Sequence, residues 1–229
     1  MEQICGHAGL KASVRRSYIC SFAKMFYIQG DYAMVRHHNN IRPNLKGDYP
    51  EIDPSALIDP SAQIIGKVKV GKNVFIAPLA VIRSDEPGPD GSVSPIILGE
   101  ECNIQDGVII HSHGGKEVII GPRTSIAHGV TIHGPCTIGE DCFIAIRSTL
   151  YSANLEKSVW IGMNATIMRV TLDAFSYVPA GSVIRSKHDV WDLRLISEKE
   201  KSYMENVLLA TNRLREDYRQ FLISNSTRT

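Results

Sequence analysis

The chain has 229 residues, of which 43% are apolar and 21% charged, and its formal net charge is +1. It contains no run of about 18 apolar residues, so we predict no transmembrane helix and no membrane partner. The balanced charge argues against a nucleic-acid partner, because general nucleic-acid binders are strongly basic. The five cysteines lack both CxxC spacing and the density of a small secreted scaffold. Composition therefore predicts a globular cytoplasmic protein and leaves its chemistry open.

Residues 1–48 are interpreted as an N-terminal extension without a repeat. Basic residues outnumber acidic ones in this stretch, as they do in organellar import segments. Lys24 interrupts the apolar stretch at 17–28, which argues against a secretory signal. The first interpretation of this stretch is therefore an organellar import segment. The second is a disordered extension, and the third is a start codon placed too early, with Met25 or Met34 as the true start. All three stay open at this point.

Residues 49–187 carry a repeat of six residues. Its aliphatic positions include Ile52, Ile58, Ile64, Val70, Ile76, Ile82, Ile120, Ile126, Ile132, Ile138, Ile144 and Leu150. The fourth residue after each aliphatic is small or medium-sized, and three of these inward positions hold cysteines that we predict to be buried thiols: Cys102, Cys136 and Cys142. A period of six does not fit a helix, but it fits short strands that alternate with turns and stack coil on coil. With three repeats to a coil, the segment predicts an all-β fold, a parallel β-helix of about seven coils.

Three stretches of the repeat carry a more specific resemblance. They are IRSDE at 82–86, NIQDGVIIH at 103–111 and HGVTIHGP at 128–135. With these stretches, the repeat segment resembles the gamma-class carbonic anhydrases, whose hexapeptide repeats build a left-handed parallel β-helix. The resemblance implies carbon dioxide and bicarbonate as substrates. It also implies a homotrimer with metal sites at the interfaces between its subunits.

The resemblance also assigns roles to individual residues. It implies that His111, His128 and His133 bind a metal. Three imidazoles with one open position are typical of catalytic zinc, although iron(II) and cobalt(II) also accept such ligands. A metal of this kind lowers the pKa of bound water from 15.7 to about 7 and so supplies hydroxide at neutral pH. Gln105 matches the residue that hydrogen-bonds the solvent or substrate, with Asn103 supporting it.

The group that carries the proton to solvent is less clearly marked. Glu86 matches an acidic active-site position of the family. The longer acidic loop that these enzymes carry after the first metal ligand is shortened here to SHGGKE at 112–117, and its acidic position is missing. His113 in this loop has a suitable pKa to replace it. The alternative is that His113 is an exposed histidine without a role.

The repeat itself also places the histidines, provided that the loops at 83–97 and 112–119 rejoin the stack in register. Repeats three apart share a face, so Arg83, His111 and His133 should stack outward in successive coils about 4.8 Å apart. Asp106 and His128 fall on a neighbouring face, one coil apart. Because the two faces diverge, we expect His128 to join the other histidines only across an interface between chains. Three chains close this heterologous contact into a ring, in which Arg83 would pair with Asp106; the alternative is that both charges face solvent.

Residues 188–229 are interpreted as a C-terminal amphipathic helix and tail. Its predicted apolar stripe contains Met204, Val207, Leu208, Thr211, Leu214, Tyr218, Phe221 and Leu222. Arg215 and Arg219 are among the charged residues predicted to lie off this stripe. Ser197 and Glu200 have the spacing of a capping box. We expect the helix to cover a face or an end of the coil stack, and a helix that binds a partner is the alternative.

These observations favour a metal-dependent carbonic anhydrase, a lyase also called carbonate dehydratase. The shortened loop and the N-terminal extension leave a second interpretation, a non-catalytic scaffold or assembly subunit with the same fold. A hexapeptide acyltransferase is the third, and it would not explain why His111 stacks on His133.

Overall fold

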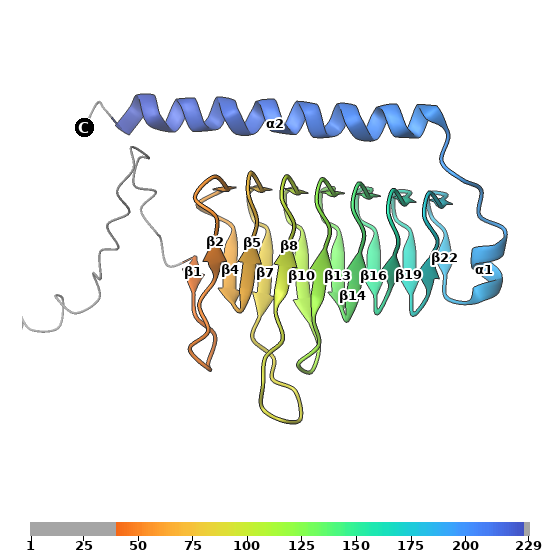
Figure 1. Ribbon diagram of the computed structural model, residues 1–229, viewed down its shortest axis with the longest axis horizontal. Coiled ribbons are helices and arrows are strands. Elements are labelled where there is room, and N and C mark those ends of the chain that lie inside the picture. The colour runs from red at the N-terminus through yellow and green to blue at the C-terminus, as the bar shows by residue number, and fades with distance from the viewer. Residues whose placement is uncertain (1–39, 227–229) are drawn as a thin grey trace, which may run out of the picture. The chain divides into compact units, whose positions relative to one another are not determined.

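A computed structural model of the chain describes residues 40–226. Our interpretations of residues 1–39 therefore lie outside the described residues. The described part contains 22 short strands followed by two helices. The strands form three parallel sheets, A, B and C, in which each strand pairs with the strand three further along the chain (Figure 1). This topology confirms the predicted β-helix of about seven coils with a C-terminal helix.

Each coil takes one strand from sheet B, one from sheet C and one from sheet A in turn. Sheet A consists of β1 (Ile41–Arg42), β4 (Gln63–Gly66), β7 (Val81–Ser84), β10 (Ile109–Ser112), β13 (Thr131–Gly134), β16 (Thr149–Tyr151), β19 (Thr166–Met168) and β22 (Val183–Ile184). Sheet B consists of β2 (Glu51–Ile52), β5 (Val68–Val70), β8 (Ile96–Leu98), β11 (Val118–Ile120), β14 (Cys136–Ile138), β17 (Asn154–Leu155) and β20 (Thr171–Leu172). Sheet C consists of β3 (Leu57–Ile58), β6 (Phe75–Ile76), β9 (Asn103–Ile104), β12 (Ser125–Ile126), β15 (Phe143–Ile144), β18 (Trp160–Ile161) and β21 (Tyr177–Val178).

The first strand, β1, lies within the segment that the sequence assigns to the N-terminal extension. Ile41 pairs with Ile64 in sheet A and packs against the core. The stack therefore begins before residue 49. The repeat does not reveal this strand, because a loop rather than six-residue steps separates Ile41 from Ile52.

The core is the column of inward aliphatic residues that the repeat predicts. Ile64, Ile82, Ile110 and Ile132 are fully buried in it. The predicted burial of Cys102, Cys136 and Cys142 is also confirmed, since each is 1% exposed. Burial raises the pKa of Cys102 and of Cys142 to about 12, so these thiols stay protonated.

Two helices follow the last strand. The short α1 (Lys187–Trp191) begins at an N-cap, Ser186, whose side chain forms a capping box with Asp189. The long α2 (Glu198–Ser226) runs along the coil stack over the outer face of sheet C (Figure 1). At its start, the Glu200 carboxylate accepts hydrogen bonds from the backbone N–H and the hydroxyl of Ser197, and the first of these is one of the two bonds of the predicted capping box.

The side of α2 that faces the sheets differs in part from the predicted stripe. Met204 and Thr211 are buried, as expected, but Tyr218 is 49% exposed. Arg215, predicted to lie off the stripe, is only 9% exposed, and its Nη1 donates to the carbonyl of Asn73 at 2.6 Å. Arg219 likewise donates to the carbonyl of Ser55. Turn carbonyls lie under this end of α2 beside the ring of Phe75, and the two arginines donate hydrogen bonds to them.

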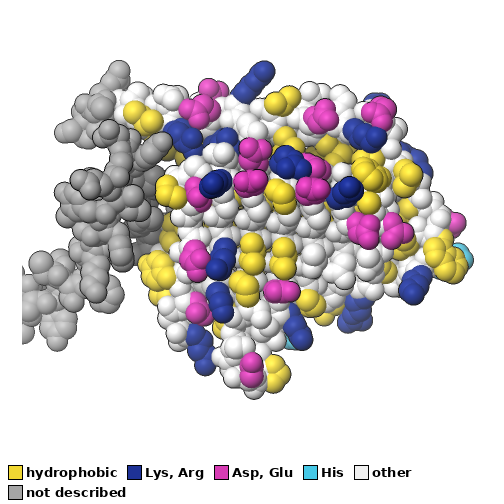
Figure 2. Space-filling view, in the orientation of Figure 1, with side chains coloured by type: hydrophobic (Ala, Val, Ile, Leu, Met, Phe, Trp, Pro, Cys, Tyr) yellow, Lys and Arg dark blue, Asp and Glu magenta, His cyan; other side chains and the backbone are white. Residues whose placement is uncertain are grey.

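Among the residues that the structure describes, no helix is both long and apolar enough to cross a membrane. On the face that Figure 2 shows, acidic and basic side chains are interspersed along α2 and the coil edge below it. This face therefore offers no broad surface of one charge.

Candidate metal site

Two of the predicted metal ligands lie side by side on sheet A. His111 on β10 is the Cα partner of Arg83 on β7 and of His133 on β13. The two imidazole rings are 5.3 Å apart between centroids, in an edge-to-face arrangement. Because strand alternation turns all three side chains outward, the sheet holds them in one column on the surface.

The third histidine lies on the C–A corner, the set of turns that join each strand of sheet C to the next strand of sheet A. Gly107 and Gly129 adopt φ values of +66° in these turns, directly after Asp106 and His128. The backbone N–H of Gly129 donates to the carbonyl of Asp106 at 2.9 Å, so the two turns stack. His128 Nδ1 donates to the Asp106 Oδ2 at 2.8 Å. Asp106 therefore orients the ring of His128 and leaves its Nε2 for another partner.

One chain does not bring the three histidines together. Within residues 40–226, no group of three or more His, Cys, Asp or Glu side chains is arranged to hold a metal ion. His111 and His133 belong to sheet A, and His128 belongs to the C–A corner. A site that uses all three imidazoles therefore needs a second chain.

The surroundings of His111 are charged. Arg83 Nη2 lies 3.3 Å from His111 Nε2, and the carboxylates of Asp85 and Glu86 lie 3.5 and 3.8 Å from the same atom. Burial, followed by the nearby Arg83 guanidinium, lowers the pKa of His111. This shift favours the neutral imidazole, which is the form that binds metals.

The charges predicted to meet across an interface have other partners within the chain. Arg83 Nη1 forms an ion pair with Asp85 at 3.4 Å, whereas Asp106 holds His128. A pair between Arg83 and Asp106 of different chains would therefore compete with these contacts.

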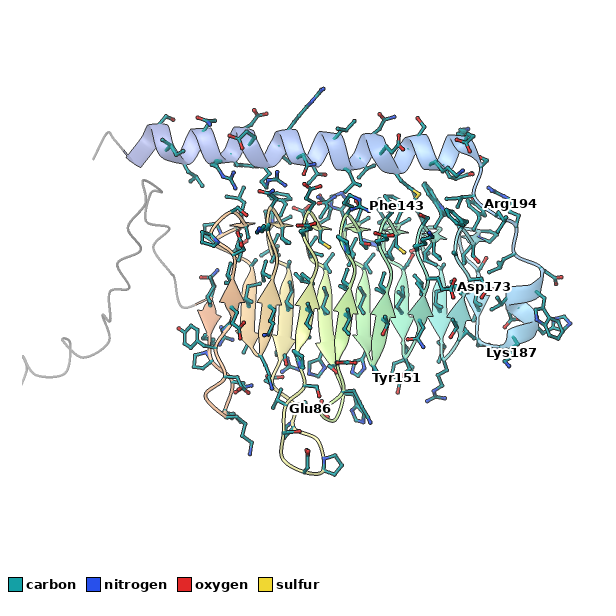
Figure 3. All side chains as sticks on the ribbon, in the orientation of Figure 1. Glu86, Phe143, Tyr151, Asp173, Lys187 and Arg194 are labelled. Atoms are coloured by element: carbon teal, nitrogen blue, oxygen red, sulfur yellow. The ribbon has the colours of Figure 1, made fainter. Side chains whose placement is uncertain are left out.

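Two loops place Glu86 beside the histidines. The backbone N–H of Gly115 donates to the carbonyl of Glu86 at 3.2 Å, which joins the loop after β7 to the loop after β10. A Cβ atom on Gly115 would lie 2.6 Å from the backbone of Gly88, so the close approach of the two loops requires glycine at position 115. Figure 3 shows Glu86 at the edge of the coil stack opposite α2. Its carboxylate reaches His113 Nδ1 at 3.2 Å, and His113 is 67% exposed.

Asn103 and Gln105 lie on sheet C and at its end, near His128. The Gln105 amide donates to the Asn103 Oδ1, and Asn103 is buried. Both residues line a groove of about 560 Å³ between sheet C, the C–A corner and α2. Asn103 therefore holds the side chain of Gln105, and the predicted roles of the two residues toward solvent or substrate stay predictions.

Sequence reasoning did not assign a role to two residues beside the site. Asp85 contacts His111, and its place in the IRSDE stretch is the signal that marks it. Tyr151 is the Cα partner of His133, and the two rings are 5.5 Å apart. The repeat also contains this signal, because Tyr151 follows His133 by three six-residue steps.

Comparison with known proteins establishes the class of the fold. Residues 135–169 match the family model described as the hexapeptide repeat of succinyl-transferase. A solved structure of a hexapeptide transferase family protein from Anaplasma phagocytophilum covers 78% of this chain and 97% of its own, with a TM-score of 0.66 and 24% identity. The protein is a left-handed parallel β-helix of the hexapeptide-repeat class.

Sequence relatives identify the family within this class. The carbonic anhydrase of Methanosarcina thermophila is 33% identical over 177 residues, which cover 69% of each chain. The carboxysome assembly protein CcmM of Nostoc sp. is 33% identical over 178 residues, which cover 73% of this chain but 31% of that protein. The chain belongs to the gamma-class carbonic anhydrase family, which confirms the resemblance found in its motifs.

Proposed function

We propose that the protein is a carbonic anhydrase that hydrates carbon dioxide reversibly to bicarbonate at metal sites shared between the chains of a homotrimer. One observation carries this proposal. His111 and His133 are stacked in register on one surface, while Asp106 orients His128 on another surface of the same chain. Two imidazoles from one chain and one from the next complete a three-histidine donor set.

This donor set fits a divalent metal with an open coordination position. We propose zinc, with iron(II) and cobalt(II) as the alternatives that imidazole ligands also bind. The chemical contribution of such a metal is to acidify water to a pKa near 7, so that hydroxide is available to attack carbon dioxide. The lowered pKa of His111 keeps that imidazole in the form that binds a metal.

The chain's own residues supply orientation. Asp106 accepts from Nδ1 of His128 and presents its Nε2 to the site. Asn103 accepts from the Gln105 amide and so fixes the side chain that hydrogen-bonds solvent or substrate. We assign the proton route to Glu86 and His113, because their side chains form a continuous path from His111 to solvent.

The surface around the site supports a homotrimer. Large apolar side chains are exposed on the outer face of sheet A and on the C–A corner: Leu79 (68%), Ile109 (45%), Ile146 (36%), Met163 (50%) and Val183 (55%). Burial of such a surface favours association. A heterologous contact between these two surfaces closes after three chains, and the Arg83–Asp106 pair belongs to the same contact.

Mixed trimers test the shared site. We expect His111→Ala and His128→Ala chains each to lose metal and carbon dioxide hydration when expressed alone under anaerobic conditions. When the two chains are expressed together in equal amounts, three quarters of the trimers are mixed, and each mixed trimer has one intact site of three. Metal content and activity should then return to about a quarter of the wild-type values.

A His188→Ala chain serves as the control, because His188 lies in α1 outside the repeat. It should retain full metal content. Full metal content in both single variants would contradict the shared site. So would a mixture of the two chains in which neither metal content nor activity returns.

Two observations favour a second candidate function, a non-catalytic assembly subunit. The loop after β10 lacks the acidic position of the family, and one relative is the carboxysome assembly protein CcmM. Trimers that bind stoichiometric metal but do not hydrate carbon dioxide would identify this function.

A further inference from the structure

We propose that Tyr151 of one chain enters the groove beside His128 of the next chain, so that the interface continues past the metal site. This inference rests on the proposed shared site, because it starts from the meeting of His133 with His128 of a second chain. To that site it adds a contact surface, the groove beside His128, and a residue, Tyr151, that covers one side of the metal site.

Each residue of the interface lies at a defined level along the coil stack. His128 and His133 belong to the same coil, the one that contains β12 and β13. In the next coil, Ile146 takes the place of His128, and the N–H of Arg147 donates to the His128 carbonyl at 3.0 Å. Tyr151 takes the place of His133 on sheet A, as its Cα partner. On sheet A and on the C–A corner, successive residues of each column therefore lie one strand spacing apart along the stack.

Symmetry then fixes which residues meet. Rotation about an axis parallel to the stack keeps every coil at its level. Contact between His133 of one chain and His128 of the next therefore places Tyr151 opposite Ile146. One coil further, Met168 pairs with Tyr151 on sheet A, while Met163 follows Ile146 on the corner. Beyond the contact between the histidines, the interface would therefore continue with apolar side chains on both chains.

The corner is hollow at this level. The groove of about 560 Å³ is lined by small residues next to the corner, Ala127, Ala145 and Gly162, and by aromatic residues of sheet C. Ile146 and Met163 form one wall, and Tyr203 and Leu214 of α2 lie on the other side. Its far end carries His128 and Gln105. An apolar hollow with a polar end suits a tyrosine, whose ring is apolar and whose hydroxyl is polar.

Tyr151 is held ready for this contact. Its ring lies 5.5 Å from that of His133, and the Arg169 guanidinium lies 5.3 Å from its centroid. Figure 3 shows it at the same edge of the stack as Glu86 and away from Phe143, which lies under α2. These two contacts reduce the freedom of the ring, so less conformational entropy is lost when a second chain packs against it.

Photo-crosslinking of the full chain tests the proposal. A benzophenone amino acid replaces Tyr151, and one half of the chains carries heavy isotopes so that links between chains are recognised by mass. We expect links from position 151 to peptides that contain Ile146, Met163 or Leu214 of a different chain. The control carries the same group at Thr137, an exposed residue on the outer face of sheet B, and should give no such links.

Light scattering on the same samples separates the two proposals. Trimers whose position 151 links elsewhere, or only within its own chain, would overturn this inference and leave the shared metal site standing. Monomers without links between chains would overturn both. A further variant, Ile146→Asp, should raise the concentration at which trimers dissociate about tenfold or more, because it places a charge opposite the tyrosine ring.

Discussion

At His128, one hydrogen bond fixes the direction of a side chain for which we propose a metal shared with a second chain. Its Nδ1 donates to the Asp106 Oδ2 at 2.8 Å, which sets both the tautomer and the direction of the ring. Glu86, in the loop after β7, contacts two histidines of its own chain, His111 and His113. We therefore expect a substitution at Asp106 to affect metal binding, and substitutions at Glu86 or His113 to affect proton transfer.

Asp106→Asn should weaken zinc binding on the order of 10- to 100-fold, because a neutral amide holds the imidazole less strongly than a carboxylate does. Competition with a chelator of known affinity measures the change. Asp173→Asn, a change of the same size in an exposed turn of the stack, is the control and should leave the affinity unaltered. Equal zinc affinities in the unaltered chain, Asp106→Asn and Asp173→Asn would show that Asp106 does not contribute to metal binding.

Glu86→Gln and His113→Ala should each make carbon dioxide hydration depend on buffer concentration while metal content stays constant. Each change interrupts the path from His111 to solvent, so a small buffer molecule must carry the proton instead. Stopped-flow rates over a range of imidazole buffer concentrations provide the measurement. If the rates stay independent of buffer in both variants, neither residue carries the proton.

The sequence predicted the faces and levels of the site residues from its six-residue repeat, provided that the loops at 83–97 and 112–119 rejoin the stack in register. Arg83, His111 and His133 are Cα partners, so both loops do rejoin the stack in register. The repeat contains no information on side-chain rotamers, so the pairing of Asp106 with His128 was not predicted. It also says nothing about loops of irregular length, where Glu86 meets His113.

At the scale of elements, the sequence likewise predicted one feature of α2 and missed another. Its 3.6-residue period predicted a helix over the coil stack, and the structure has one. The period did not predict that Arg215 faces the sheet, because this depends on the Asn73 carbonyl that lies beneath it. The start of the helix depends on charge, since Arg194 Nη2 donates to the Glu200 carboxylate at 2.9 Å.

The cap of α2 should weaken in acid. Hydrogen bonds from Arg194 and then Ser197 hold the pKa of Glu200 at about 2, below its ordinary 4.5. A lowered carboxyl pKa stabilises the folded state fully above about pH 4.5, and this stabilisation is lost as the pH falls to about 2. Trp160 reports the change, because Tyr203 of α2 packs against it at 5.5 Å.

We therefore expect the fluorescence of Trp160 to change between pH 4.5 and 2 in a Trp191→Phe background. Glu200→Gln in the same background should lack this change, since its side chain does not titrate. A transition of equal size in both proteins would show that other carboxylates cause it.

At the scale of the whole molecule, α2 joins coils that are far apart in the stack. Arg219 donates to the carbonyl of Ser55 in the first full coil, whereas Met204 packs with Phe143 on β15. In a stack of repeats each coil otherwise contacts only its neighbours. The helix adds contacts that a partly unfolded stack would lose together, and so favours unfolding as one unit.

The buried thiols measure this cooperativity. Cys102 and Cys142 lie two coils apart and have pKa values of about 12, so maleimide should not modify them in the folded protein at pH 7. With increasing urea, we expect both to become reactive at the same concentration, as mass spectrometry of the labelled peptides would show. In an Arg215→Ala, Arg219→Ala variant the two midpoints should separate. Separate midpoints in the unaltered chain would contradict the role given to α2.

The position of α2 in the chain has a consequence for synthesis on the ribosome. The helix follows all the strands of residues 40–226, yet it covers aromatic residues made long before it, including Phe75 and Phe143. Until α2 emerges, these rings form an apolar column on the nascent chain that is open to chaperones or to other nascent chains. Arrival of the helix therefore marks the moment at which sheet C becomes closed, while the surface that holds the histidines stays available for assembly.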